Sequence, residues 1–188
     1  EGQVMQNRKG DWGAVTRMNL IAGVVQAHRD GFGFLIPDGG GQDVFLPPRQ
    51  MRSLMNGDRV LVRISGTDFK GRPEGSVAEV LERGTHTVVG RLHLDQGISY
   101  LIPENQRVQQ DVLIPPDQRM GAQRGQMVVA EITAPPGSRT LPVGKIIEIL
   151  GAHMAPGMEI EAALRGHNLP HEWPPEVGRE AEAIPETV

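Results

Sequence analysis

The sequence predicts an all-β protein of two small five-stranded closed barrels in tandem, with a short helical C-terminal tail. Two observations predict this fold. Gly and Pro are abundant, with 24 and 15 copies among 188 residues, which favours short strands joined by turns. Five short hydrophobic blocks also recur in the same order in two consecutive stretches. Closing a short sheet into a barrel removes its unpaired edges, so each stretch is expected to form one barrel.

The repeated blocks define the strands. In the first stretch the blocks are residues 23–25, 31–37, 43–48, 57–63 and 75–81, and in the second 90–92, 97–103, 111–116, 125–131 and 144–150. Each is rich in Val, Ile, Leu or Phe and is bounded by turn residues, as expected of β-strands. A short helical turn is expected between the third and fourth strands, which makes each unit an OB fold. The predicted units span residues 23–84 and 85–151.

The two ends of the chain lie outside the repeat. Residues 1–14 predict a hairpin, and residues 1–22 are interpreted as a hairpin and linker from an absent upstream domain; the alternative is that the hairpin lies on the first barrel. Residues 152–188 are interpreted as a linker to an absent downstream domain, with helices expected at 158–166 and 176–183. The chain opens on Glu rather than Met, which favours an internal fragment or a processed piece.

Composition excludes several classes of protein. The chain contains no cysteine, which excludes a disulfide scaffold, thiol catalysis and a Cys-based zinc site, and suits a reducing cytoplasm. No apolar run is long enough to span a membrane. The net charge is −4, but its acidic excess lies after residue 152. The two units are balanced in charge and favour Arg over Lys, which suits RNA without demonstrating it.

Three aromatic residues of the first unit form the main candidate site. Phe32 and Phe34 are two apart in a predicted strand, so both rings are expected on one face, and antiparallel pairing is expected to place Phe45 beside them. Leu35 and other aliphatic residues alternate with the rings and can supply the inward face. We call these three rings the aromatic platform, and the alternative is that they belong to the core.

Cationic side chains and glycines flank the aromatic platform. His28, Arg29 and Arg49 are expected at its edge, where they can contact phosphate. Gly31 and Gly33 are interpreted as room for a close ligand. Stacking on such rings contributes roughly 1–3 kcal/mol per base and tolerates any sequence. The pattern therefore predicts a site for single-stranded RNA.

These motifs resemble a known family. Gly31-Phe-Gly-Phe-Leu35 followed by Val44-Phe-Leu46 resembles the two RNA-binding motifs of cold-shock domains. With residues 111–118 and 143–148, and with Leu164-Arg-Gly-His167 and Trp173-Pro174 further along, the chain resembles the tandem cold-shock region of bacterial ribonuclease R (RNase R). The first hairpin resembles the wing of that family's helix-turn-helix domain.

The resemblance implies a parent enzyme that hydrolyses RNA processively from its 3′ end, with Mg²⁺ held by aspartates of a domain outside this chain. The aspartates in the first unit are dispersed at turns, where Asp serves turn geometry. The chain itself is therefore expected to have no catalytic residue and no cofactor, and to guide RNA towards the nuclease domain. Single-stranded RNA is the expected partner, with the ribosome or other RNA-decay factors as further candidates and no membrane.

The second unit departs from the first. Ile98 and Tyr100 stand where the first unit has its Phe pair, and Leu113 stands in place of Phe45. With one ring left, this unit is expected to pack, or to guide RNA through Tyr100 and Arg91. Two other functions stay open: a free-standing RNA chaperone, and a protein-interaction module, for example on the ribosome, that uses its loops.

Overall fold

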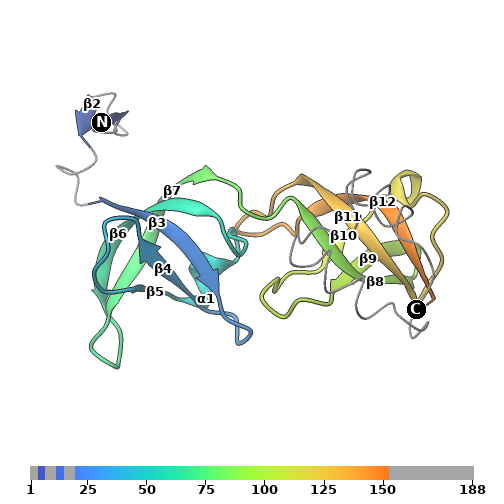
Figure 1. The fold of residues 1–188 in the computed structure, drawn as a ribbon, viewed down its shortest axis with the longest axis horizontal. Helices are drawn as coiled ribbons and strands as arrows, with labels where there is room; N and C mark the ends of the chain where they lie inside the picture. The colour runs from blue at the N-terminus through green and yellow to red at the C-terminus, as the bar shows by residue number, and fades with distance from the viewer. Residues whose placement is uncertain (1–3, 7–11, 15–19, 153–188) are drawn as a thin grey trace, which may run out of the picture.

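The computed structural model describes residues 4–6, 12–14 and 20–152. Two closed five-stranded barrels follow each other along the chain (Figure 1), which confirms the predicted fold. Strands β1 (Val4–Gln6) and β2 (Trp12–Ala14) pair antiparallel and confirm the strands of the predicted hairpin. The helices predicted at 158–166 and 176–183 lie outside the described residues.

The two barrels have the same topology. In the first, the order around the barrel is β3-β4-β5-β7-β6, with β3 (Leu20–Ala27), β4 (Gly33–Pro37), β5 (Val44–Leu46), β6 (Arg59–Thr67) and β7 (Pro73–Glu82). In the second, the order is β10-β12-β11-β8-β9, with β8 (Thr87–Asp95), β9 (Ile98–Pro103), β10 (Val112–Leu113), β11 (Gln126–Ala134) and β12 (Val143–Ala152). The third and fifth strands of each unit pair in parallel, and all other pairs are antiparallel.

A short helical turn follows the third strand of each barrel, as predicted. The turn is α1 (Pro48–Met51) in the first barrel and the 3-10 turn η2 (Pro116–Gln118) in the second. Proline stands at the first position of both turns, where its missing N–H costs nothing and its fixed φ suits a helical start. Met51 at the end of α1 is buried and joins the core of the first barrel.

Each barrel encloses one aliphatic core. The first is formed by Val25, Ala27, Leu35, Val44, Leu46, Met51, Leu54, Val60 and Val62. The second is formed by Met55, Val88, Leu92, Leu101, Val112, Ile114, Ala122, Val128, Ala130 and Ile146. In β4, β5 and β9 the buried residues alternate with more exposed ones, because successive side chains point to opposite faces of a sheet. The alternation places the aromatic rings of the first barrel outside its core.

Gly23 and Gly90 occupy equivalent positions in the first strands of the two barrels. A Cβ atom built on Gly23 would lie 2.3 Å from the carbonyl oxygen of Ile36, and one built on Gly90 would lie 2.2 Å from that of Ile102. Only glycine allows the backbones to approach this closely. The repeated glycine at the start of each unit is therefore a requirement of barrel packing.

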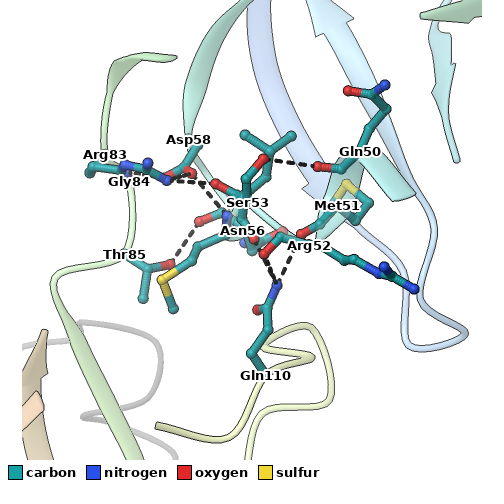
Figure 2. A network of polar contacts seen from close by, with 12 residues as sticks. Gln50, Met51, Arg52, Ser53, Asn56, Asp58, Arg83, Gly84, Thr85 and Gln110 are labelled. Atoms are coloured by element: carbon teal, nitrogen blue, oxygen red, sulfur yellow. Dashed lines mark hydrogen bonds and ion pairs between the residues drawn. The ribbon is translucent and has the colours of Figure 1, made fainter. Parts of the chain in front are cut away.

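The buried carboxylate of Asp58 anchors the linker between the barrels (Figure 2). It accepts hydrogen bonds from the guanidinium of Arg83 (2.8 Å), the main-chain N–H of Gly84 (3.0 Å) and that of Met55 (2.9 Å). A buried carboxylate is stable only when it is paired and hydrogen-bonded. Asp58 therefore fixes the path of the chain as it leaves the first barrel.

Side chains from each barrel also contact the other. Met55 belongs to the loop before β6 of the first barrel, yet it packs into the core of the second. In the opposite direction, the side-chain amide of Gln110 donates to the carbonyl oxygens of Met51 (2.9 Å) and Leu54 (3.2 Å) (Figure 2). These contacts join the two barrels by both apolar packing and hydrogen bonds.

Candidate nucleic-acid interface

The aromatic platform forms as the sequence predicted. Phe34 on β4 lies directly opposite Phe45 on β5, and their ring centroids are 6.0 Å apart. Phe32, which directly precedes β4, lies 5.7 Å from each of the other two rings. All three rings are half-buried, whereas Leu35 and Val44 are 0% and 1% exposed. The rings therefore form the outer face of the barrel, and the alternative that they form its core is wrong.

Of the two glycines beside the rings, Gly33 has another role than the predicted one. A Cβ on Gly33 would lie 2.6 Å from the sulfur of Met51, so this glycine allows α1 to pack against the barrel. Gly31 has open space around it but a φ of +93°, a conformation that other residues rarely adopt. The interpretation of Gly33 as room for a ligand is wrong, because the space beside it is already filled.

His28 extends the platform through the β3–β4 turn. Its imidazole stacks on Phe32 with ring centroids 4.3 Å apart and planes 10° from parallel. The main-chain N–H of His28 donates to the carbonyl of Phe32 (2.8 Å) and closes the turn. Gln109 of the second barrel donates its side-chain amide to the carbonyls of both His28 and Phe32. The β3–β4 turn, which carries the rings of His28 and Phe32, is therefore held in place by a side chain of the second barrel.

The predicted arginines lie at the surface with carboxylates beside them. Arg29 is 70% exposed, and its Nε lies 3.7 Å from Asp30. Arg49 forms a 2.9 Å ion pair with Glu74, which is the cross-strand partner of Phe45. Exposed ion pairs contribute little to stability, so either guanidinium can exchange its carboxylate for a phosphate at small cost.

Arg72 is a platform residue that the sequence analysis missed. Its guanidinium lies over the rings of Phe34 (5.0 Å) and Phe45 (5.3 Å), a cation–π arrangement. It also forms a 2.6 Å ion pair with Asp68. No local sequence motif indicates the role of Arg72. This residue directly precedes β7 and reaches the rings only because β7 pairs with β5 when the barrel closes.

Hydrogen bonding keeps Asp68 ionised under Arg72. Burial of this carboxyl opposes ionisation, but hydrogen bonds from the main chain and guanidinium of Arg72 and from the main chain of Lys70 outweigh burial and lower its pKa. The Asp68 side chain is only 2% exposed. It therefore provides a fixed negative partner that orients Arg72 over the platform.

The second barrel carries a smaller aromatic pair. Tyr100 on β9 lies opposite His93 on β8, with ring centroids 5.5 Å apart. His93 is a neighbour of Tyr100 that the sequence analysis did not consider. Arg91 is two residues before His93 on β8 and therefore lies on the same face of the strand. Burial raises the pKa of the Asp111 carboxyl above its ordinary value, and the nearby His93 offsets this increase only in part.

The described residues contain no group of three or more His, Asp or Glu side chains placed to hold a metal ion. Among the same residues, no helix has the length and apolar character needed to cross a membrane.

Comparison with known protein families finds one match in each half of the chain. Residues 23–80 match the family described as ribonuclease B OB domain, and residues 100–174 match the family described as cold shock domain. Ribonuclease R of Acidithiobacillus ferrooxidans is 47% identical over 100% of this chain and 43% of the relative. Ribonuclease R of Escherichia coli (strain K12) is 40% identical over 100% of this chain and 23% of the relative. The chain spans less than half the length of these relatives.

Solved structures share the fold. The structure of Mycoplasma genitalium RNase R in complex with ribose-methylated single-stranded RNA has a TM-score of 0.74 and 15% identity, over 89% of this chain and 27% of that chain. Yeast Ssd1, a pseudonuclease, has a TM-score of 0.66 and 20% identity, over 82% of this chain and 25% of that chain. At these identities the likeness shows the tandem-barrel fold alone.

Proposed function

We propose that this chain, which corresponds over its full length to the OB and cold-shock domain region of bacterial ribonuclease R, binds single-stranded RNA on the aromatic platform. The observation that carries the proposal is the cluster of three half-buried rings on the outer face of β4 and β5. Such rings offer stacking surfaces to unpaired bases, whose faces are inaccessible in a duplex.

The cations around the rings complete the proposed site. Arg72 lies over two of the rings, and Arg49 stands at their edge with a surface ion pair. A strand whose bases stack on the platform would bring its phosphates to these guanidinium groups. Tyr100 and Arg91 of the second barrel are proposed to contact RNA beyond the first barrel, although fewer rings lie there.

We further propose that the chain guides RNA towards a nuclease domain in a longer protein. This proposal is based on the two ribonuclease R relatives, which are longer than the chain: it covers 43% of one and 23% of the other. Magnesium-dependent hydrolysis would then belong to that domain, and the chain alone would bind RNA without degrading it. Its lack of cysteine suits the reducing cytoplasm in which such an enzyme would act.

Replacing Phe45 tests whether the platform binds RNA. Leu113 occupies the equivalent position in the second barrel, opposite Tyr100, so the fold tolerates Leu there. Phe45→Leu is expected to weaken binding of a fluorescent single-stranded oligouridylate by roughly 1–3 kcal/mol through the loss of one stacking ring. Fluorescence anisotropy at fixed salt measures the dissociation constant.

Phe45→Trp is the matched control, because it keeps an aromatic surface and is expected to retain the affinity of the unmodified chain. Urea unfolding of each variant shows whether the barrel is intact. Unchanged RNA affinity in a folded Phe45→Leu variant would contradict the proposal.

A further inference from the structure

We propose that RNA binding on the aromatic platform is coupled to docking of the second barrel against the first, with Met55 anchoring the docked arrangement and Gln109 transmitting it to the platform. The inference rests on the proposed function of the platform. It assigns a role to the junction between the barrels, which consists of residues 51–58, 83–85 and 108–110 and carries none of the rings or arginines of the proposed RNA site.

Met55 is buried in the second barrel. Its side chain is 2% exposed and belongs to the core cluster of that barrel, although it lies in the loop before β6 of the first. Gln123 is its equivalent in the second barrel, because each stands two residues before the glycine that begins the fourth repeated block. Gln123 is exposed, so a barrel of this topology does not require an apolar side chain at this position. The burial of Met55 is therefore a consequence of docking.

The loop that carries this methionine is fixed to the first barrel. The side-chain oxygen of Asn56 accepts a hydrogen bond from the main-chain N–H of Ala27 (3.0 Å), and its carbonyl accepts one from the Thr85 hydroxyl (2.8 Å) (Figure 2). The linker crosses the loop closely, since a Cβ atom on Gly84 would lie 2.1 Å from the carbonyl oxygen of Gly57. Because the loop is already ordered, the methionine enters the second barrel without a large loss of conformational freedom.

The β9–β10 loop of the second barrel connects this anchor to the platform. Val108, in that loop, packs against the core cluster that includes Met55. The next residue, Gln109, donates its side-chain amide to the carbonyls of His28 and Phe32, which bound the β3–β4 turn. These hydrogen bonds can form only while the barrels are docked. Docking therefore orders the turn before RNA binds.

Coupling between RNA and the junction follows from this order. Without the hydrogen bonds of Gln109, the β3–β4 turn has to be ordered when a base stacks on Phe32, so the undocked chain binds RNA more weakly. The loss of one hydrogen bond corresponds to a roughly twofold to tenfold change in affinity. Coupling between two equilibria is reciprocal, so RNA favours the docked arrangement by the same factor.

The first test truncates Met55 and measures RNA affinity. Met55→Ala is expected to weaken binding of a fluorescent oligouridylate of about four nucleotides, the smallest site size of such a barrel, roughly twofold to tenfold in anisotropy titrations. Met55→Leu keeps the apolar volume and is expected to retain the affinity of the unmodified chain. Gln123→Ala is the matched control, because it truncates an exposed side chain at the equivalent loop position. Amide hydrogen exchange in β3, β4 and β5 shows whether the first barrel is folded in each variant.

The second test measures the reciprocal effect in the unmodified chain. Hydrogen peroxide converts accessible methionine into its sulfoxide, and Met55 becomes accessible when the junction opens. A saturating amount of the same oligouridylate is expected to slow oxidation of Met55 roughly twofold to tenfold. Met120, which is 63% exposed, is the internal control and is expected to react at an unchanged rate. In Gln109→Ala the protection of Met55 is expected to disappear, whereas RNA that bridged the barrels directly would still protect it. Mass spectrometry of peptides measures both rates.

The outcomes separate the coupling from the platform. Unchanged RNA affinity in a folded Met55→Ala variant, an equal loss in Gln123→Ala, or oxidation of Met55 that RNA does not slow would overturn the coupling. Protection that persists in Gln109→Ala would overturn the role of Gln109. If Phe45→Leu weakens binding while Met55→Ala does not, the platform proposal stands and the coupling fails. If the unmodified chain does not bind the RNA, both proposals fail.

Discussion

Asp68 links two functions of the first barrel at the scale of a single residue. Its carboxylate closes the β6–β7 turn through main-chain hydrogen bonds and holds Arg72 over the aromatic platform. The same hydrogen bonds lower its pKa below the ordinary value of 3.8. The ionised form is therefore favoured in the folded chain more than in the unfolded one, and this difference stabilises the fold.

Asp68→Asn is expected to lower the free energy of unfolding at neutral pH. Because the folded pKa is lowered, the contribution of the charge is fully present above the unfolded pKa and is lost as pH falls through the lower, folded pKa. The stability difference between Asp68→Asn and the unmodified chain should therefore shrink between about pH 7 and about pH 3. Urea unfolding at both pH values measures it.

Asp38→Asn is the control for Asp68→Asn, since Asp38 forms a partly exposed ion pair with Arg59. Such surface pairs contribute little, so this variant is expected to change stability less at neutral pH. A stability difference for Asp68→Asn that is the same at both pH values would contradict the account of Asp68.

The sequence predicted which platform residues face outward wherever core and surface side chains alternate along a strand. Leu35 and Phe34 are neighbours in one strand, and the period of two alone assigns one to the core and the other to the surface. Arg72 and His93 were missed because each joins its aromatic partners through strand pairing. Gly33 was misinterpreted because its closest neighbour, Met51, lies in a helix that packs across the barrel.

Strands were more predictable than the contacts between loops. Each strand is predicted by a short hydrophobic run bounded by Gly and Pro, and the same runs recur in the same order in the second unit. In contrast, Gln109 of the β9–β10 loop bonds to residues of the β3–β4 turn that lie 81 and 77 positions earlier. Nothing in the sequence around Gln109 indicates this partner.

The β9–β10 loop is expected to support RNA binding by the first barrel. Gln109→Ala removes the amide that holds the carbonyls of His28 and Phe32, so the turn must be ordered when RNA binds. A hydrogen bond contributes about 0.5–1.5 kcal/mol, which corresponds to a roughly twofold to tenfold loss of affinity for single-stranded RNA. Anisotropy titration measures the affinity, and amide hydrogen exchange at Gly31 reports the opening of the turn.

Gln110→Ala is the matched control, because Gln110 donates across the same junction to carbonyls of Met51 and Leu54, away from the aromatic rings. It should loosen the junction and leave RNA affinity nearly unchanged. Equal losses of RNA affinity in both variants would show that the junction as a whole matters, and that Gln109 has no separate positioning role.

The whole molecule combines two barrels of one topology with different surfaces. The platform of the first barrel has three Phe rings, with His28 and Arg72 packed against them, and the second barrel carries Tyr100 and His93. The repeat predicted the common fold, because packing demands the same glycines and aliphatic residues in both units. The proposed division of RNA contacts between the barrels rests on side chains of the outer faces, which packing leaves free to differ.

The central claim is that the chain binds single-stranded RNA through its aromatic surface. The most direct measurement is a titration of the full chain with fluorescent single-stranded RNA and with a duplex of the same sequence, at low and at physiological salt. The account predicts tighter binding of the single strand, because only unpaired bases can stack on the rings, and weaker binding at higher salt, because phosphate contacts release counterions. Equal or tighter binding of the duplex would contradict it.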